Sequence, residues 1–212
     1  MEFEALLDQV KDLPLFSSNL LQVGDTLPAQ FYKQLSRWVK SGKILQLRRG
    51  LYTLSEPYRK ETPHPFLLAN QLLAPSYISL QSALAYFALI PEAVPRVTSV
   101  TSRKRTQTFT TPLGQFSYRS LQPGMFSGFQ LVEMSPTQRA FLARPEKALL
   151  DLVYLTPKGE GPAFLKSLRL QNLDLLDMDW LRDFTAEIGK PKLIRAADNL
   201  TQIASGERYH TL

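Results

Sequence analysis

The chain has 212 residues, of which 44% are hydrophobic and 21% are charged, and its net charge is +6. This composition excludes an intrinsically disordered chain, and no apolar run approaches the roughly 18–20 residues of a membrane span. The absence of cysteine excludes disulfides and thiolate metal sites, so we expect a cytoplasmic protein. The positive charge favours an anionic partner, and nucleic acid is the commonest one.

The first 56 residues predict a small helical module that ends in a β-hairpin. Hydrophobic residues recur at helical spacing in three consecutive segments, residues 2–13, 14–24 and 26–43. The short runs KILQL and GLYTL follow and predict the two strands of the hairpin. The expected core of the module consists of Phe3, Leu7, Leu20, Phe31, Leu35, Trp38, Ile44 and Tyr52.

The third predicted helix and the hairpin carry basic residues and no acid. Between Thr26 and Leu54 there are six basic side chains and neither Asp nor Glu. A basic helix followed by a basic hairpin is the organisation of a winged helix-turn-helix, whose third helix enters the major groove of DNA. For any single residue, the solvated face of an ordinary helix is the alternative. The predicted DNA contacts are Gln30, Lys33, Gln34, Arg37 and Lys40 in the recognition helix and Lys43, Arg48 and Arg49 in the wing.

A polar segment with three prolines, residues 55–65, separates this module from the rest of the chain. We therefore predict a DNA-binding domain over 1–56, a linker over 57–65 and a second domain over 66–212. Within the second domain, PFLLANQLL and SLQSALAYFALI predict helices, and four more helical segments follow one another from Pro145 onward. Between them, RVTSVTS, TQTFTTP, GQFSYRSL, GFQLVEM and RAFLAR predict strands of a small antiparallel sheet. The expected fold class is α+β, with a winged helix-turn-helix followed by a mixed domain that has a helical C-terminal part.

A second acid-free stretch extends from Ala93 to Val132. Basic loops beside exposed aromatic side chains suit nucleic-acid contact, so this stretch could form a second binding surface, including one for RNA. A solvated hairpin loop is the simpler interpretation, and the alternation of the aromatic residues favours a place in the core. The basic residues are Arg96, Arg103, Lys104, Arg105 and Arg119, and the aromatic residues are Phe109, Phe116 and Tyr118.

Catalytic and metal-binding patterns are weak in this sequence. The two histidines, His64 and His210, have no second ligand at metal-binding spacing, and neither a phosphate-binding loop nor a nucleophile elbow is present. Glu146, Lys147 and Asp151 could be drawn as a nuclease-like cluster. A first-turn acid at a helix N-terminus and an i, i+4 ion pair on the outer face of that helix explain them better. We therefore expect no catalytic residue, no metal, no cofactor and no enzymatic activity.

Three segments of the second domain resemble a known family. SLQSAL begins at Ser79, PLGQFSYR at Pro112 and PEKALLD at Pro145. In this combination, between about residues 76 and 155, the chain resembles the AbiEi-type antitoxins of type IV toxin–antitoxin systems. Such antitoxins also carry an N-terminal winged helix with an Arg-Gly-Xaa-Tyr wing, which is similar to the segment from Arg49 to Tyr52.

The resemblance implies a transcriptional regulator of a phage-defence operon. Its winged helix would repress the operon by binding double-stranded DNA upstream of its own gene. Its second domain would counteract a nucleotidyltransferase-like toxin without a stable complex between the two. The alternative from a different class is an RNA-binding or protein-interaction module without operator-specific DNA binding.

Overall fold

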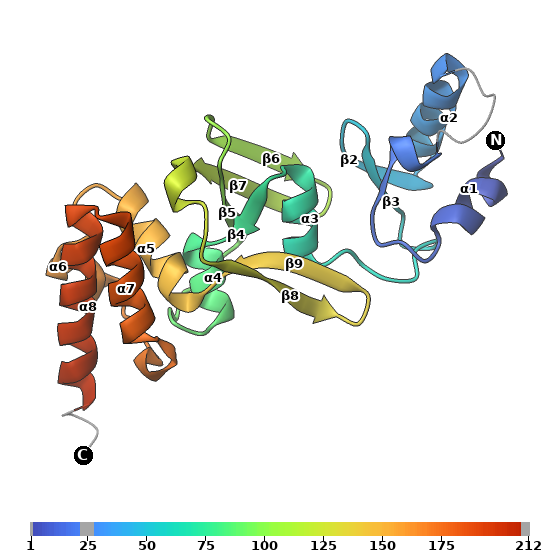
Figure 1. The fold of residues 1–212 in the computed structure, drawn as a ribbon. Helices are drawn as coiled ribbons and strands as arrows, with labels where there is room; N and C mark the ends of the chain where they lie inside the picture. Colours follow the sequence, from blue (N-terminus) through green and yellow to red (C-terminus); the bar gives the residue numbers. More distant parts are fainter. Residues whose placement is uncertain (1, 22–27, 209–212) are drawn as a thin grey trace.

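The computed structural model describes residues 2–21 and 28–208 (Figure 1). In this part of the chain the protein is a mixed α+β structure, and none of its helices is long and apolar enough to cross a membrane. The elements of the first region are α1 (Phe3–Val10), β1 (Phe16–Ser17), η1 (Ser18–Leu21), α2 (Pro28–Lys40), β2 (Ile44–Arg48) and β3 (Leu51–Leu54). The next are α3 (Pro65–Leu72), β4 (Ser76–Ile78), α4 (Leu80–Tyr86), β5 (Arg96–Thr101), β6 (Gln107–Thr111), β7 (Gly114–Ser120), η2 (Pro123–Met125), β8 (Phe129–Ser135) and β9 (Gln138–Ala143). The chain continues through α5 (Pro145–Leu155), α6 (Pro162–Ser167), η3 (Leu173–Leu175), α7 (Met178–Ile188) and α8 (Pro191–Arg208).

The N-terminal region is built on a small antiparallel sheet with the strand order β1-β3-β2. The apolar stripe expected on α2 is confirmed, because Phe31, Leu35 and Trp38 are buried. They pack into an aromatic-rich cluster that also contains residues of α1 and of the hairpin. The buried members of this cluster, which we call the N-terminal core, are Phe3, Leu6, Val10, Phe16, Leu21, Phe31, Leu35, Trp38, Ile44, Tyr52 and Leu54.

The helix predicted over residues 14–24 is wrong for the residues that are described, and Gly24 lies outside them. Phe16 pairs with Tyr52 across β1 and β3, and its buried side chain needs that extended conformation. Only the single turn η1 is helical, and Leu20 on it is 50% exposed instead of belonging to the core. Strand pairing with the hairpin therefore prevails over the local helical pattern.

The second sheet has six strands in the order β6-β7-β5-β4-β9-β8. All five predicted strands are present, but the sheet is mixed instead of antiparallel, because β5 pairs with β7 and β4 pairs with β9 in parallel. Strand β6 and its loops separate β5 from β7, and a much longer stretch that includes α4 separates β4 from β9, so both pairs have the long connection that parallel pairing needs. Strand β4 was not predicted. It is a three-residue strand in which Tyr77 and Ile78 are buried, too short to show alternation.

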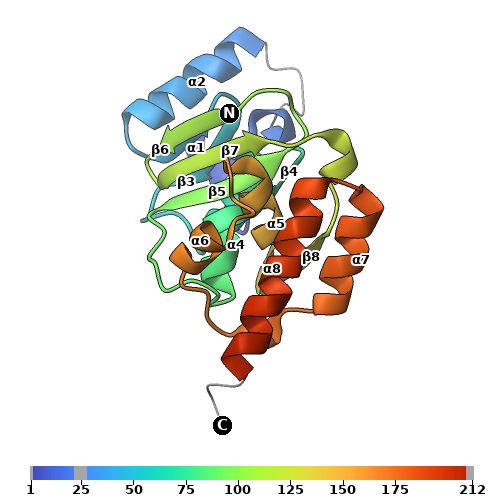
Figure 2. The same cartoon turned by 90° about the vertical axis from the view of Figure 1, so that its left-hand side faces the viewer.

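Helices cover both faces of this sheet. Tyr118 and Arg119 are neighbours on β7 and therefore point to opposite faces. The Tyr118 hydroxyl donates a hydrogen bond to the Ala69 carbonyl in α3, whereas the Arg119 guanidinium donates to the Leu155 carbonyl at the end of α5. Figure 1 accordingly shows the N-terminal region and the C-terminal helices on opposite sides of the sheet, and Figure 2 shows α7 and α8 beside α5.

Helix α5 carries a buried ion pair, which corrects the prediction of an exposed one. Lys147 and Asp151 form an i, i+4 pair with no solvent exposure of either side chain. The predicted i, i+4 spacing of the pair is confirmed, but the pair does not lie on an outer face of the helix, because α5 is enclosed by α4, α7, α8 and the sheet. Glu146, at the first turn, is also buried and accepts a hydrogen bond from the backbone N–H of Asp177.

Strand β4 and its following loop complete this ion pair. The Tyr77 hydroxyl lies 2.7 Å from Lys147 Nζ and 2.9 Å from Asp151 Oδ2, and the Ser79 hydroxyl donates to the same carboxylate at 2.7 Å. Burial lowers the pKa of Lys147 and raises that of Asp151, and each partner opposes the shift of the other. The charges are tolerated because both are hydrogen-bonded, and the network ties β4 to α5.

Candidate nucleic-acid interface

The exposed face of α2 is basic and slightly hollowed. Lys33, Arg37 and Lys40 are exposed, and so is Gln30, whereas Gln34 is only partly exposed. The buried stripe described above fixes the rotation of the helix and so turns the basic residues outward. The described residues that line the hollow, which has a volume of about 390 Å³, are Ala29, Tyr32, Lys33, Ser36, Arg37 and Lys40.

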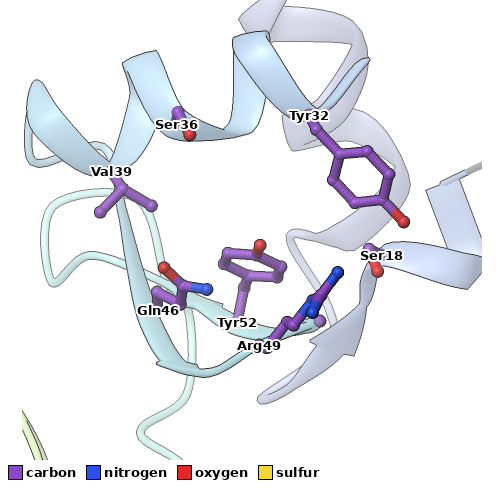
Figure 3. Close-up of a pocket in the computed structure, with 8 residues that line it drawn as sticks. Ser18, Tyr32, Ser36, Val39, Gln46, Arg49 and Tyr52 are labelled. Carbon is purple, nitrogen blue, oxygen red and sulfur yellow. The ribbon is translucent and has the colours of Figure 1, made fainter. Parts of the chain in front are cut away.

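A deeper pocket lies between α2 and the β2–β3 hairpin (Figure 3). It has a volume of about 450 Å³. Figure 3 shows Tyr32 and Arg49, from opposite walls, turned toward the same space beside Ser18. The described residues that line this pocket, which we call the hairpin pocket, are Ser18, Tyr32, Ser36, Val39, Gln46, Arg49, Gly50 and Tyr52.

The two-residue turn of the hairpin shapes the floor of this pocket. Gly50 has a φ of +80°, a left-handed conformation that favours glycine, and an added Cβ would lie 3.3 Å from the Ser18 hydroxyl oxygen. The Gly50 carbonyl accepts a hydrogen bond of 2.9 Å from the Ser18 N–H. Burial raises the pKa of Tyr52, and the nearby Tyr32 raises it further, so Tyr52 remains a neutral hydroxyl. The turn and η1 are thus hydrogen-bonded to each other, and together with α2 they enclose the pocket.

The predicted wing residues do not act as one group. Lys43 is turned toward α1, with its Nζ 4.4 Å from the centre of the Phe3 ring. The Arg48 guanidinium donates a hydrogen bond of 3.2 Å to the Gln71 carbonyl near the end of α3, where the helix dipole favours a cation. Of the three, Arg49 lines the hairpin pocket next to α2. The sequence could not separate these roles, because the partners of Lys43 and Arg48 are distant in the chain.

The second basic surface is divided as well. Arg96 begins β5 and Arg103 follows its end, so the length of the strand, roughly 20 Å, separates them. Arg96 is hydrogen-bonded to the side chain of Gln115, and Arg103 donates to the Ala74 carbonyl at 2.8 Å. Arg119 is bound to the carbonyl at the end of α5, as described above. Lys104 is exposed in the β5–β6 loop, as is Arg105 beside it.

The aromatic residues of the same stretch belong to the core. Phe116 is 1% exposed and Tyr118 is fully buried, and the partly buried Phe109 packs against Tyr118 with its ring centre 5.6 Å away. Their alternation along β6 and β7 therefore reflects core packing, as the sequence pattern favoured. They form no exposed stacking platform for nucleic-acid bases.

The candidate metal ligands are also accounted for in the described part of the chain. His64 caps α3, because its Nδ1 accepts a hydrogen bond of 3.2 Å from the Phe66 N–H. His210 lies outside the described residues. No group of three or more His, Cys, Asp or Glu side chains that could hold a metal ion occurs among the residues described.

Sequence reasoning missed the polar residues that join the two hollows. Tyr32 and Ser36 line both the hollow on α2 and the hairpin pocket, so they form a ridge between them. They are four residues apart on a helix, which places them on one face. Their position next to Lys33 and Arg37 in the sequence was the available signal.

No family model matches this chain, and no curated protein is significantly similar to it.

Proposed function

We propose that residues 1–56 are a winged helix-turn-helix domain that binds double-stranded DNA. Helix α1, strand β1, the single turn η1, helix α2 and the β2–β3 hairpin follow one another along the chain, and this order supports the proposal with η1 in the place of a second helix. In this proposal α2 is the recognition helix in the major groove, and the turn at Arg49 approaches the phosphate backbone. The domain is part of a transcriptional repressor that binds upstream of its own operon.

The observation that carries the proposal is the pair of neighbouring hollows on α2 and at the hairpin, whose charged lining residues are all basic. The outward basic residues of α2 and the Arg49 side chain flank one ridge, formed by Tyr32 and Ser36. No acidic residue is found among the described residues that line either hollow. A surface with one sign of charge attracts the DNA backbone, and long basic side chains on a helix reach base edges.

The second part of the proposal concerns the rest of the chain. We propose that residues 66–212 act as an antitoxin of a type IV toxin–antitoxin system and counteract a nucleotidyltransferase-like toxin. The resemblance of the segments at Ser79, Pro112 and Pro145 to AbiEi-type antitoxins supports this part. Enzymatic activity is not part of the proposal, since the buried Lys147 and Asp151 are engaged in the ion pair that joins β4 to α5.

The test of DNA binding is a mobility-shift titration on the DNA upstream of the gene, at several salt concentrations. A bidentate base contact contributes about 1–3 kcal/mol, so Arg37→Ala should weaken binding about tenfold or more and relax sequence discrimination. Lys33→Ala should act in the same direction. Arg182→Ala, an exposed arginine on α7, is the matched control and should bind normally.

Two outcomes would redirect the assignment. Normal repression by a folded double variant of Lys33 and Arg37 would show that α2 is not the recognition helix. Preference for single-stranded RNA over duplex DNA would favour the RNA-binding alternative.

The double variant of Lys33 and Arg37 also tests the antitoxin role when it is co-expressed with the toxin. It should lose repression but still protect the cell from the toxin.

A further inference from the structure

The hairpin pocket concentrates hydrogen-bond donors around one cation. Arg49 supplies the guanidinium, while Ser18, Ser36, Tyr32 and Tyr52 supply hydroxyl groups. Figure 3 shows the Tyr52 hydroxyl directed toward α2, and the Arg49 side chain on the Tyr32 side of the same space. A positively charged fork surrounded by hydroxyl donors matches the oxygen atoms of a phosphate group.

The position of the pocket indicates which part of a bound nucleic acid it would contact. The ridge of Tyr32 and Ser36 separates the hairpin pocket from the hollow that contains Lys33 and Arg37. A nucleic-acid strand that lies across this ridge presents one group to each hollow. In the DNA-binding mode proposed above, the side of the ridge toward Arg37 would face the bases in the groove, and the side toward Arg49 would receive the sugar-phosphate backbone.

We propose that the hairpin pocket is a phosphate-binding site in which Arg49, Tyr32 and Ser36 hold one phosphate group of the bound nucleic acid. This inference rests on the proposed DNA-binding function and adds the location and ligands of one contact. Arg49 forms the ion pair, and the two hydroxyl groups on α2 donate to the remaining phosphate oxygens. Because these hydroxyls belong to the recognition helix, the phosphate fixes how deeply α2 enters the groove.

The contrast between Arg48 and Arg49 supports this assignment. The two residues are adjacent and both are exposed, but Arg48 is hydrogen-bonded to the end of α3, whereas Arg49 lines the hairpin pocket. Gly50 permits the close approach of Ser18, which closes the pocket on one side. The end of β2 therefore directs Arg48 to α3, and the turn directs Arg49 to the hairpin pocket.

The first arm of the test uses duplex DNA from the region upstream of the gene. Arg49→Ala should weaken binding about tenfold and lower the slope of log K against log salt by about 0.9, the value for one phosphate contact. Tyr32→Phe removes only the hydroxyl and should weaken binding about tenfold to a hundredfold, as for a hydrogen bond to a charged group. Tyr86→Phe is the matched control, because Tyr86 and Tyr32 are both 46% exposed, and it should bind normally.

Replacement of single phosphates by neutral methylphosphonates locates the contact. At the contacted position the substitution should weaken binding by the wild-type protein but leave binding by Arg49→Ala and Tyr32→Phe unchanged. If both variants lose as much affinity as the wild-type protein at every methylphosphonate position, the phosphate site is refuted. DNA binding by α2 would remain.

The second arm uses inorganic phosphate alone and separates this inference from the proposed function. Phosphate should shift the NMR signals of Tyr32, Ser36 and Arg49 in the wild-type protein and not the corresponding signals in Arg49→Ala. If phosphate binds there but duplex DNA does not bind at all, the site stands with a free phosphate as its ligand, and the DNA-binding function fails. If DNA binds and neither arm depends on Arg49, Tyr32 or Ser36, the phosphate site is refuted.

Discussion

The two faces of the β2–β3 hairpin belong to different hydrophobic cores. On one face, Ile44, Tyr52 and Leu54 pack with α1 and α2 in the N-terminal core. On the other face, Leu47 and Leu51 are buried in the larger cluster that contains the six-stranded sheet and its helices. The hairpin is therefore shared by both regions of the molecule, although the sequence predicted that the polar segment directly after it, residues 55–65, separates them.

The linker alone therefore does not define how the two regions are connected. Arg48, the last residue of β2, reaches α3, and β2 lies beside β6. The linker itself is bound, because Ser135 donates to the Glu61 carboxylate at 2.7 Å and Gln138 bonds to the backbone of Thr62. A basic turn proposed to meet DNA is thus also a contact with the second region, which couples the two physically.

The largest effect should come from the core of the second region. Asp151→Ala leaves the Lys147 charge buried without its partner, so the free energy of unfolding should fall by about 3–5 kcal/mol. Asp179→Ala removes an exposed partner of Arg182 and should change the stability by no more than about 0.5 kcal/mol. Chemical denaturation of both variants measures the difference. Equal stability of the two variants would show that the buried pair contributes nothing to the fold.

Two leucines of one strand test the division of the hairpin. Leu51→Ala and Leu54→Ala each remove a buried side chain, and each should lower the free energy of unfolding by about 2–5 kcal/mol. Hydrogen exchange should distinguish them. Leu54→Ala should speed exchange in α1 and α2, whereas Leu51→Ala should also speed it in α3. Exchange changes limited to the N-terminal region in both variants would contradict a shared hairpin.

The neighbouring arginines give a smaller and more specific contrast. Arg48→Met keeps the aliphatic stem and loses the hydrogen bond to Gln71, so the free energy of unfolding should fall by about 0.5–1.5 kcal/mol. Arg49→Met should leave the stability unchanged and weaken DNA binding. Thermal unfolding and a DNA titration on the same two samples provide the comparison. If instead Arg48→Met weakened DNA binding and Arg49→Met lowered the stability, Arg48 and not Arg49 would be the DNA contact.

The smallest effect concerns the cap of α3. Burial lowers the pKa of His64, so its neutral Nδ1 accepts the hydrogen bond from the Phe66 N–H at pH 7. The unfolded chain takes up this proton first as the pH falls below the ordinary value of 6.5. The stability due to the cap is therefore complete above that value and is lost as the pH falls through the folded pKa, by at most about 1 kcal/mol.

The variant His64→Asn isolates this titration, because asparagine caps a helix without changing charge between pH 5 and 8. The free energy of unfolding, measured between pH 5 and 8, should fall less with decreasing pH in the variant than in the wild-type protein. If it falls equally in both, the pH dependence comes from a group other than His64.

Local patterns predicted much of this structure. The spacing of Phe31, Leu35 and Trp38 predicted the buried face of α2, and the strand-like runs from Arg96 to Ala143 predicted five strands. These signals depend on neighbouring residues, so a sequence carries them directly. The exposed basic face of α2 followed from the same periodicity.

Long-range packing determined what could not be predicted. The pairing of Phe16 with Tyr52 turned a helical pattern into a strand, and the helices around α5 buried Lys147 and Asp151. Likewise, Arg48 and Arg49 are equivalent in the sequence and differ only because α3 lies next to one of them. The hairpin pocket was missed for the same reason, since it exists only when α2, η1 and the turn come together.

The segment after α3 has a consequence for how this chain can evolve. Arg48 and Arg103 come from opposite sides of the linker and bind the carbonyls of Gln71 and Ala74, three positions apart. A single insertion or deletion there would displace both basic loops at once, whereas one in the turn between β6 and β7 would displace neither. The length of residues 71–75 should therefore resist change even where its side chains vary, and the position of two distant surface charges depends on that length.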